Sequence, residues 1–211
     1  MFGYKPSVIK NEIMKKIFFA FGAFICIPHI LLFALRRKSD GGQKLSKDIN
    51  VWLSRKNHSG YGQIKGLVYL LLKLKEFRNL YYHRMGKGTL IFSWILPKRS
   101  TLHIFTPSER IGGGFYIGHG WGTVVNAYCI GEGCLVAQNT TIGSKDLKTP
   151  ILGNHVSIWS HCVVLGGVEI GDNSQIGSGA VVVKNIPDGC VVVPAKSSII
   201  KKNGERVNIL L

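Results

Sequence analysis

The chain has 211 residues, 45% of them apolar, which is enough for one domain with a substantial core plus an accessory segment. Its formal net charge is +16, and residues 1–100 hold 19 of the 27 Lys and Arg residues but only four of the 11 acidic ones. This basic half points to anionic partners. The five cysteines are odd in number and lack a C-x-x-C pair, which fits neither a disulfide framework nor a zinc site and indicates reduced thiols in a cytosolic compartment.

An apolar run at residues 17–35 carries no formal charge and has basic residues on both sides. Nineteen helical residues span roughly 28 Å, near the thickness of a bilayer core. Pro28 would kink such a helix, and His29 would be costly in mid-membrane. We interpret residues 1–40 as a membrane-associating segment that lies on the membrane surface. A true span, a buried helix and a signal peptide stay open as alternatives.

Residues 41–100 are predicted to form a helical region. Within it, the spacing of Leu67, Leu70, Leu71, Leu74 and Phe77 predicts one helix over residues 64–82. That helix could pack against the rest of the protein or make a second membrane contact. A membrane explains the basic half better than nucleic acid does, because no nucleic-acid module is recognisable and aliphatic bulk separates the charges.

Residues 101–211 carry an internal repeat of six. Aliphatic residues recur at every sixth position without a break: Leu152, Ile158, Val164, Ile170, Ile176 and Val182. Small or aliphatic residues stand four positions after each: Val156, Cys162, Val168, Ser174, Ala180 and Ile186. A helix cannot produce a period of six, and a simple strand alternates with a period of two. The pattern predicts a mainly β fold, a left-handed parallel β-helix in which three repeats make one triangular coil.

The repeat continues upstream in a second phase and is interrupted twice. Val124, Ile130, Val136 and Ile142 are predicted to point inward, and the step from Ile117 to Val124 is seven residues. Before Leu152 the step is ten residues, so residues 143–151 are predicted to protrude as a loop. Cys134 and Cys162 fall on small inward positions, so we expect them to be buried packing residues.

Departures from the repeat are the natural places for chemistry. The irregular step contains Gly118–Gly122, GHGWG, in which glycines flank His119 and would let a ligand approach closely. Ile117, Val136 and Ile158 should share one face, so the residues two positions later, His119, Gln138 and Ser160, are expected to form one outward column. The candidate substrate-binding residues are Gly118, Trp121, Gln138, Lys148 and Thr149.

Residues 104–202 resemble the serine O-acetyltransferase branch of the hexapeptide-repeat acyltransferases. The resemblance rests on IGGGFYIGHGWGTVV at 111–125, QNTTIG at 138–143 and IGSGAVVVKNIPDGCVVVPAK at 176–196. It implies that His119 is the general base and acetyl-CoA the co-substrate, with no metal. An imidazole can accept a proton at neutral pH. It also implies a homotrimer with CoA between neighbouring prisms, bound by Ser160, Gly177, Ser178, Ala180, Lys184, Ala195 and Lys196.

Three departures from that branch bear on the acceptor. Ile104 stands where the branch has a carboxylate that orients the histidine, Gly118 where it has Asp, and Lys148-Thr149 where it has Arg-His. These losses argue against free serine. The chain is closer in character to O-acetyltransferases of capsule and exopolysaccharide assembly, of the colanic-acid type. We therefore expect acetyl transfer to a sugar hydroxyl of a polysaccharide or its lipid-linked precursor, in the cytoplasm at the inner membrane face.

Three alternatives remain open at this stage. The first is a serine O-acetyltransferase of cysteine biosynthesis. The second is a zinc enzyme resembling β-helical carbonic anhydrases, with His119, His155 and His161 as ligands. The third is a non-catalytic trimeric scaffold at the membrane.

Overall fold

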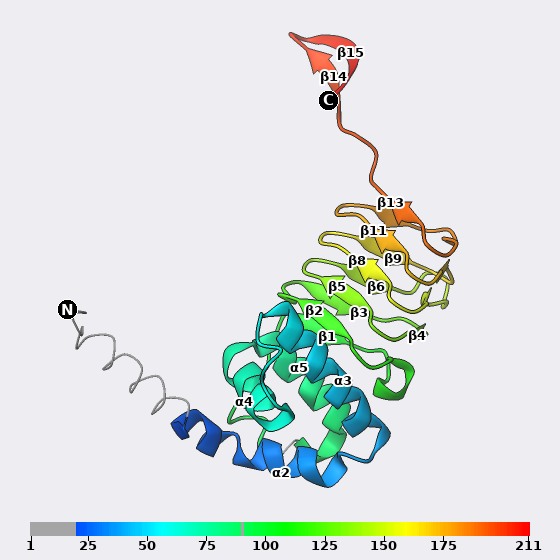
Figure 1. Cartoon of the computed structure of the whole chain (residues 1–211). Coiled ribbons are helices and arrows are strands. Elements are labelled where there is room, and N and C mark those ends of the chain that lie inside the picture. Colours follow the sequence, from blue (N-terminus) through cyan, green and yellow to red (C-terminus); the bar gives the residue numbers. More distant parts are fainter. Residues whose placement is uncertain (1–19, 90) are drawn as a thin grey trace, which may run out of the picture.

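The computed structural model describes residues 20–89 and 91–211, in which a helical region is followed by a parallel β-helix (Figure 1). Residues 20–25 are helical, and the elements that follow up to the first strand are α2 (Ile27–Arg36), α3 (Asp40–Arg55), α4 (Gln63–Lys73), α5 (Lys75–Met85) and the short 3-10 helix η1 (Gly86–Thr89). A mainly β fold with an N-terminal helical region is thus confirmed.

The predicted apolar run is divided into two helical pieces, and its residues 17–19 lie outside the described residues. A turn at Cys26 separates the pieces, and Pro28 stands in the first turn of α2, where its missing N–H costs nothing. Cys26, His29 and Phe33 are buried against the other helices. In the described part of the chain no helix has the length and apolar character needed to cross a membrane.

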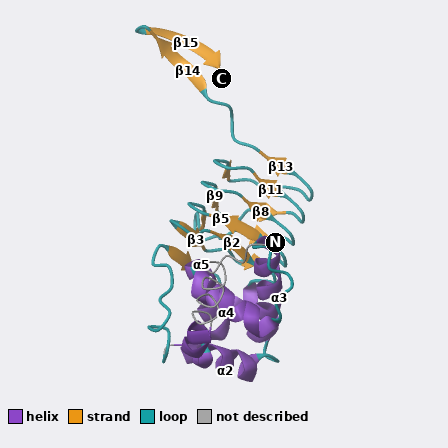
Figure 2. Cartoon of the chain, turned by 60° about the vertical axis from the view of Figure 1, so that its left-hand side comes forward, coloured by secondary structure: helices purple, strands orange, loops and turns teal. Residues whose placement is uncertain are grey.

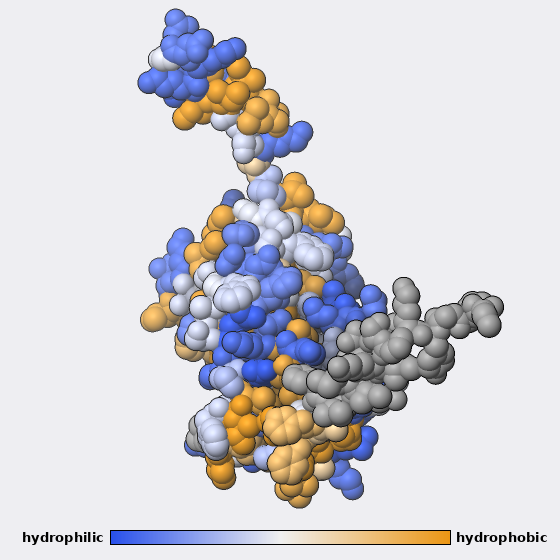
Figure 3. All heavy atoms as spheres, turned by 90° about the vertical axis from the view of Figure 1, so that its left-hand side faces the viewer, coloured by the Kyte–Doolittle hydropathy of each residue, from blue (hydrophilic) through white to orange (hydrophobic). Residues whose placement is uncertain are grey.

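The opposite side of this segment is exposed and apolar. Phe21, Phe24, Leu31 and Leu35 point to solvent, and Figure 3 shows apolar side chains gathered over this end of the molecule. Figure 2 places α2 at the end of the helical region farthest from the β-helix.

The single helix predicted over residues 64–82 is wrong. It is two helices, α4 and α5, because Leu74 adopts an extended conformation between them. The Arg78 side chain stabilises the break by donating hydrogen bonds to the carbonyls of Leu71 (2.6 Å) and Leu72 (3.0 Å) at the end of α4. Leu67, Leu70, Leu71 and Phe77 are fully buried, which confirms the packing interpretation of these leucines.

Three parallel sheets form the faces of the β-helix. The first sheet contains β1 (Leu102–Ile104), β3 (Thr123–Val125), β6 (Thr141–Gly143), β9 (Val163–Leu165) and β12 (Val181–Val182). The second contains β4 (Cys129–Ile130), β7 (Ile151–Leu152) and β10 (Glu169–Ile170). The third contains β2 (Tyr116–Gly118), β5 (Leu135–Ala137), β8 (Ser157–Ile158), β11 (Gln175–Ile176) and β13 (Val191–Val192). Successive strands visit the faces in turn, and the left-handed sense of winding stays a prediction.

The inward positions follow the six-residue period. All six aliphatic residues from Leu152 to Val182 are buried, as are Cys134 and Cys162, so these predictions are confirmed. The inward assignment of Val124 is wrong: Val125 is fully buried and pairs with Ile142, whereas Val124 is only half-buried. The corner before β3 is longer than the sequence spacing suggested.

Two further features lie outside the repeat. A loop connects β6 and β7 where the sequence predicts an insertion; Gly143 and Ile151 belong to the two strands, and Leu147 in the loop is fully exposed. After β13 the chain leaves the prism and ends in an antiparallel hairpin of β14 (Ser198–Lys202) and β15 (Glu205–Leu210) (Figure 1). Asn203 and Gly204 form its turn with positive φ angles, as Asn-Gly turns do.

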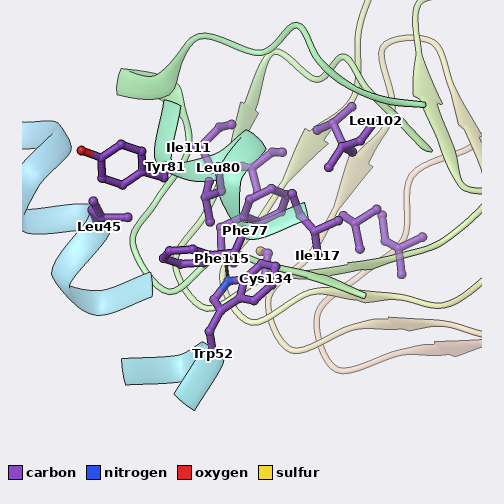
Figure 4. Packing of buried hydrophobic residues seen from close by; sticks show 14 of the residues in the cluster. Leu45, Trp52, Phe77, Leu80, Tyr81, Leu102, Ile111, Phe115, Ile117 and Cys134 are labelled. Carbon is purple, nitrogen blue, oxygen red and sulfur yellow. Dashed lines mark hydrogen bonds between the residues drawn. The ribbon is translucent and has the colours of Figure 1, made fainter. Parts of the chain in front are cut away.

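The helical region is fixed to the first coil through a shared core. Trp52 of α3 and Phe77 of α5 pack edge to face with ring centroids 5.1 Å apart, and the Trp52 indole donates a 2.8 Å hydrogen bond to the Phe115 carbonyl (Figure 4). Beside them the buried Arg84 binds Asp48 at 2.9 Å, and Asp48 also accepts from the Phe115 backbone N–H. Helices and β-helix therefore share one continuous hydrophobic cluster.

Candidate functional site

The corner that carries His119 holds two extra residues. In regular coils the N–H of the left-handed corner residue bonds to the preceding coil, as His161 does to the Gln138 carbonyl at 3.1 Å. At the first corner Asn139 donates in the same way to the carbonyl of Trp121, at 2.6 Å. Trp121 therefore corresponds to Gln138, and His119 and Gly120 form an insertion. We call these two residues the corner bulge.

The backbone of the corner bulge turns sharply outward. His119 and Gly120 have consecutive positive φ angles of 61° and 64°, and the Gly120 N–H bonds to the Gly118 carbonyl at 2.7 Å. Gly120 is required here, because a Cβ would lie 3.1 Å from Leu102 and 3.2 Å from Glu76. His119 has no such freedom, so its left-handed backbone is strained. Its imidazole is exposed, and no hydrogen bond to it is found among the described residues.

The bulge rests on a charged cluster that the sequence did not reveal. The Arg99 guanidinium lies 3.9 Å from the centroid of the Trp121 ring and donates a 2.9 Å hydrogen bond to the Glu76 carboxylate. Asn79 holds the Arg99 backbone through hydrogen bonds of 2.8 and 3.0 Å. Trp121 keeps 56% of its surface exposed. An aromatic platform with a cation on it thus stands two residues from His119.

The predicted outward column is corrected at its first member. The register of Ile117, Val136 and Ile158 is as predicted. Because of the corner bulge, however, Trp121 rather than His119 continues the column of Gln138, Ser160 and Ser178. The hydroxyls of Ser160 and Ser178 lie 3.2 Å apart and lengthen the polar edge toward the last coils.

Lys148 and Thr149 lie at another edge of the prism from His119. They belong to the loop that follows the first sheet, whereas His119 precedes that sheet. The loop folds into a turn in which Lys145 and Lys148 exchange backbone hydrogen bonds of 3.0 and 3.1 Å. Lys145, Lys148 and Lys184 line a depression of about 290 Å³ against the coils. Within one chain these residues therefore do not meet His119.

The remaining predicted residues are spread along the last coils. Gly177 and Ala180 lie in the corner after β11, where the Ala180 side chain is buried and the Gly177 N–H bonds to the Val192 carbonyl at 2.7 Å. Ala195 and Lys196 are exposed in the segment between β13 and β14. The other backbone groups of these two residues are paired within the prism as well: the Ala180 N–H bonds to the Gly177 carbonyl at 3.1 Å, and the Ala180 carbonyl accepts from the Val163 N–H at 3.0 Å.

Other candidates near His119 in sequence point elsewhere. The His103 ring stacks on Phe105 with centroids 6.0 Å apart, and Glu109 uses its carbonyl to bind Lys44 at 2.8 Å. His155 and His161 lie at the corners before and after β8, which separates them on different prism edges. Among residues 20–89 and 91–211 no group of three His, Cys, Asp or Glu side chains is arranged to hold a metal ion.

The matches to a known family and to curated relatives cover about half of the chain or less. Residues 149–184 match the family described as bacterial transferase hexapeptide (six repeats). The serine acetyltransferase of Synechococcus elongatus is 37% identical over 109 residues, which cover 49% of this chain and 45% of that protein. The Bacillus subtilis serine acetyltransferase is 34% identical over 106 residues, covering 48% and 49%. The chain thus spans about half the length of the curated relatives it matches.

Solved structures extend the likeness into the helices. The serine acetyltransferase of Neisseria gonorrhoeae in complex with serine superposes with a TM-score of 0.58 at 22% identity, over 77% of this chain and 70% of that one. A serine acetyltransferase in complex with CoA gives a TM-score of 0.55 at 19% identity, over 76% and 71%. These shares exceed what the β-helix alone can supply. The helical region is therefore part of the shared fold.

Proposed function

We propose that this chain is an acetyl-CoA-dependent O-acetyltransferase with His119 as its general base. The observation that carries the proposal is the corner bulge, which holds an exposed imidazole in a strained backbone on hexapeptide repeats of the bacterial transferase type. His155 and His161 have similar φ angles, so it is the two-residue insertion that distinguishes His119. The two relatives named above are both serine acetyltransferases, which supports the same class of reaction.

The reaction needs one proton acceptor and one polar groove. The imidazole takes the proton of an acceptor hydroxyl while its oxygen attacks the thioester carbonyl. The carbon–sulfur bond then breaks, and the CoA thiolate takes the proton back from the imidazolium. The hydroxyls of Ser160 and Ser178 offer hydrogen bonds along the edge beyond His119. The lysines around the 290 Å³ depression offer counter-charges for phosphates.

The relatives favour L-serine as the acceptor, which the sequence leaves open as an alternative, over the glycan predicted from the sequence. A second candidate, a glycan hydroxyl, is favoured by the surroundings of His119. Gly118 and Ile104 supply no carboxylate there, and Trp121 offers an exposed aromatic face on which a sugar ring could stack. In this second case the acceptor would be a polysaccharide or its lipid-linked precursor.

The separation of His119 from Lys148 and Thr149 supports a homotrimer. A neighbouring prism could bring its protruding loop to the edge that carries His119, so that CoA and acceptor bind between chains. All five cysteines are free, which agrees with work in the reducing cytoplasm.

Purified full-length protein should release CoA from acetyl-CoA in the presence of its acceptor. We expect His119→Ala to lower kcat about 100-fold or more with little change in KM for acetyl-CoA. His155→Ala is the matched control, because His155 is also an exposed corner residue with positive φ but lies at another edge. A His119→Ala enzyme as fast as the wild type would contradict the proposal.

The acceptor is decided by offering L-serine and, separately, the lipid-linked glycan of the source cell. Rapid acetylation of L-serine would reject the glycan candidate. Turnover of the glycan alone, reduced by Trp121→Ala, would reject L-serine.

A further inference from the structure

The far end of the helical region presents an apolar stripe to solvent. Residues 20–36 bury one side against the other helices and expose Phe21, Phe24, Ile27, Leu31 and Leu35 on the other. These positions recur at three- and four-residue steps, as on one face of a helix. Phe24 is 70% and Leu35 83% exposed. Such a continuous stripe needs a partner, because scattered exposed residues are ordinary but contiguous apolar patches are not.

A second apolar segment lies beside this stripe. Ile91 and Trp94, which follow η1, are 82% and 77% exposed. The 3-10 helix η1 packs on α2, since a Cβ at Gly88 would lie 3.5 Å from Leu32 and from Arg36. Tryptophan is enriched where proteins meet the surface of a bilayer. The stripe and this segment together form what we call the apolar end, and Figure 3 shows part of it.

Cations border the apolar end. Arg37 and Lys38 are exposed at the end of α2, and Lys87 is exposed on η1. Residues 1–100 carry 19 basic and four acidic side chains. An apolar face bordered by Lys and Arg fits an anionic bilayer surface, where each cation adds attraction to the acidic headgroups.

A basic cavity opens from the same 3-10 helix. It encloses about 440 Å³ between α5, η1 and β1, and its wall includes Lys87, Lys98, His83 and His103. None of its lining residues is acidic. The His83 Nε2 lies 2.8 Å from the Thr106 carbonyl and so donates to it, while the two lysines are exposed. The N–H of His83 is therefore already used, and the ammonium groups of Lys87 and Lys98 are the donors that fit the oxygens of a phosphate group.

We propose that the apolar end docks on the surface of an anionic membrane and that the basic cavity receives the phosphate of a lipid headgroup. Phe21, Phe24, Leu31, Leu35 and Trp94 enter the interface without crossing it, and Lys87 stands between the membrane contact and the cavity. The inference goes beyond the proposed reaction and does not depend on it. It places the chain where phosphate-bearing lipids, including lipid-linked acceptors, are found.

The test is flotation of full-length protein with vesicles of phosphatidylcholine, alone or mixed with phosphatidylglycerol. We expect binding to the mixed vesicles and little to the neutral ones, with weaker binding at high salt. Phe24→Ser/Leu31→Ser should lower the partition coefficient at least about 10-fold. Lys87→Ala/Lys98→Ala should lower it roughly 10- to 30-fold.

Matched controls come from the C-terminal hairpin, where Ile200→Ser and Lys201→Ala/Lys202→Ala remove similarly exposed groups. Both should bind as the wild type does, and circular dichroism checks that every variant is folded. Equal vesicle binding by the Phe24→Ser/Leu31→Ser variant would overturn the proposal. A second pair of results would also overturn it: no vesicle binding by the wild type, together with smaller particles of the Phe24→Ser/Leu31→Ser variant in light scattering. The apolar end would then join copies of the chain. Vesicle flotation is measured without acetyl-CoA. A negative result would therefore reject membrane docking and leave the proposed acetyl transfer untouched.

Discussion

At the scale of single residues, the corner bulge separates His119 from the other corner residues. Asn139, His155 and His161 also have positive φ angles, so a left-handed residue at a corner is ordinary in this β-helix. Among the described corners that follow the strands of the third sheet, only that of His119 has two such residues in succession and a chain two residues longer. The added length carries the imidazole clear of the column, while Gly120 packs closely on Leu102 and Glu76.

Buried His29 gives a prediction on acid stability. Its Nε2 lies 3.0 Å from the Tyr82 hydroxyl, which donates its own proton to the Leu96 carbonyl, so Nε2 must carry a hydrogen. Nδ1 is then a buried acceptor for which residues 20–89 and 91–211 provide no partner. Burial, assisted by the charge of Arg78, lowers the pKa of His29 from 6.5 to about 4. The unfolded state therefore takes up the proton first, and stability present above pH 6.5 is lost as the pH falls toward 4.

The loss amounts to about 3 kcal/mol in the free energy of unfolding. Urea denaturation at pH 7.5 and at pH 4.5 measures it. His29→Phe should flatten this dependence, because a phenyl ring fits among Tyr81, Tyr82 and Phe92 and does not titrate. His58→Phe is the control and should keep the wild-type profile. A His29→Phe protein as acid-sensitive as the wild type would contradict this account.

At the scale of elements, one buried ion pair joins the helices to the β-helix. Arg84 of α5 binds Asp48 of α3 and donates to the carbonyls of Ile111 and Gly112 at the first coil. Asp48→Ala should lower the free energy of unfolding by about 3–5 kcal/mol, because it leaves a buried guanidinium without its partner. Chemical denaturation measures the change. Glu132→Ala breaks the exposed pair with Lys47 and should have little effect, although it joins the same two regions.

The elements were predictable where local chemistry fixes them. The six-residue period predicted the coils from Leu152 to Val182, because each inward position demands an aliphatic side chain. The break at Leu74 was not predictable, since no Gly or Pro marks it and its stabilising residue, Arg78, bonds backward across the turn. The Asn203-Gly204 pair is a local signal for the turn of the last hairpin.

The site was likewise predictable only where a local feature of the sequence marks it. Glycines around an irregular step indicated His119, a local feature of the sequence. Its neighbours Glu76 and Arg99 lie 43 and 20 positions away and reach the bulge only through the packing of α5 on the first coil. The true length of the corner followed from backbone pairing between coils, which the spacing of aliphatic residues could not resolve because both Val124 and Val125 fit the pattern.

At the scale of the whole molecule, the two interruptions of the repeat lie on different prism edges. A site that needs both must be assembled from two chains, His119 from one and Lys148 from the protruding loop of another. The inactive variants His119→Ala and Lys148→Ala should then complement each other when they are unfolded, mixed in equal amounts and refolded together. In a cyclic trimer with random mixing, one interface in four receives both intact residues, so about a quarter of the wild-type activity should return.

The comparison is between the co-refolded mixture and the two variants refolded separately and then combined. The separate preparations should stay inactive, because their trimers contain no intact interface. A chain in which His119 and Lys148 serve the same site without a partner would give no gain on co-refolding. The fraction of activity recovered thus tests three expectations together: the trimer, the sharing of the site between chains, and the role of the loop. All three follow from the separation of His119 and Lys148 on the prism.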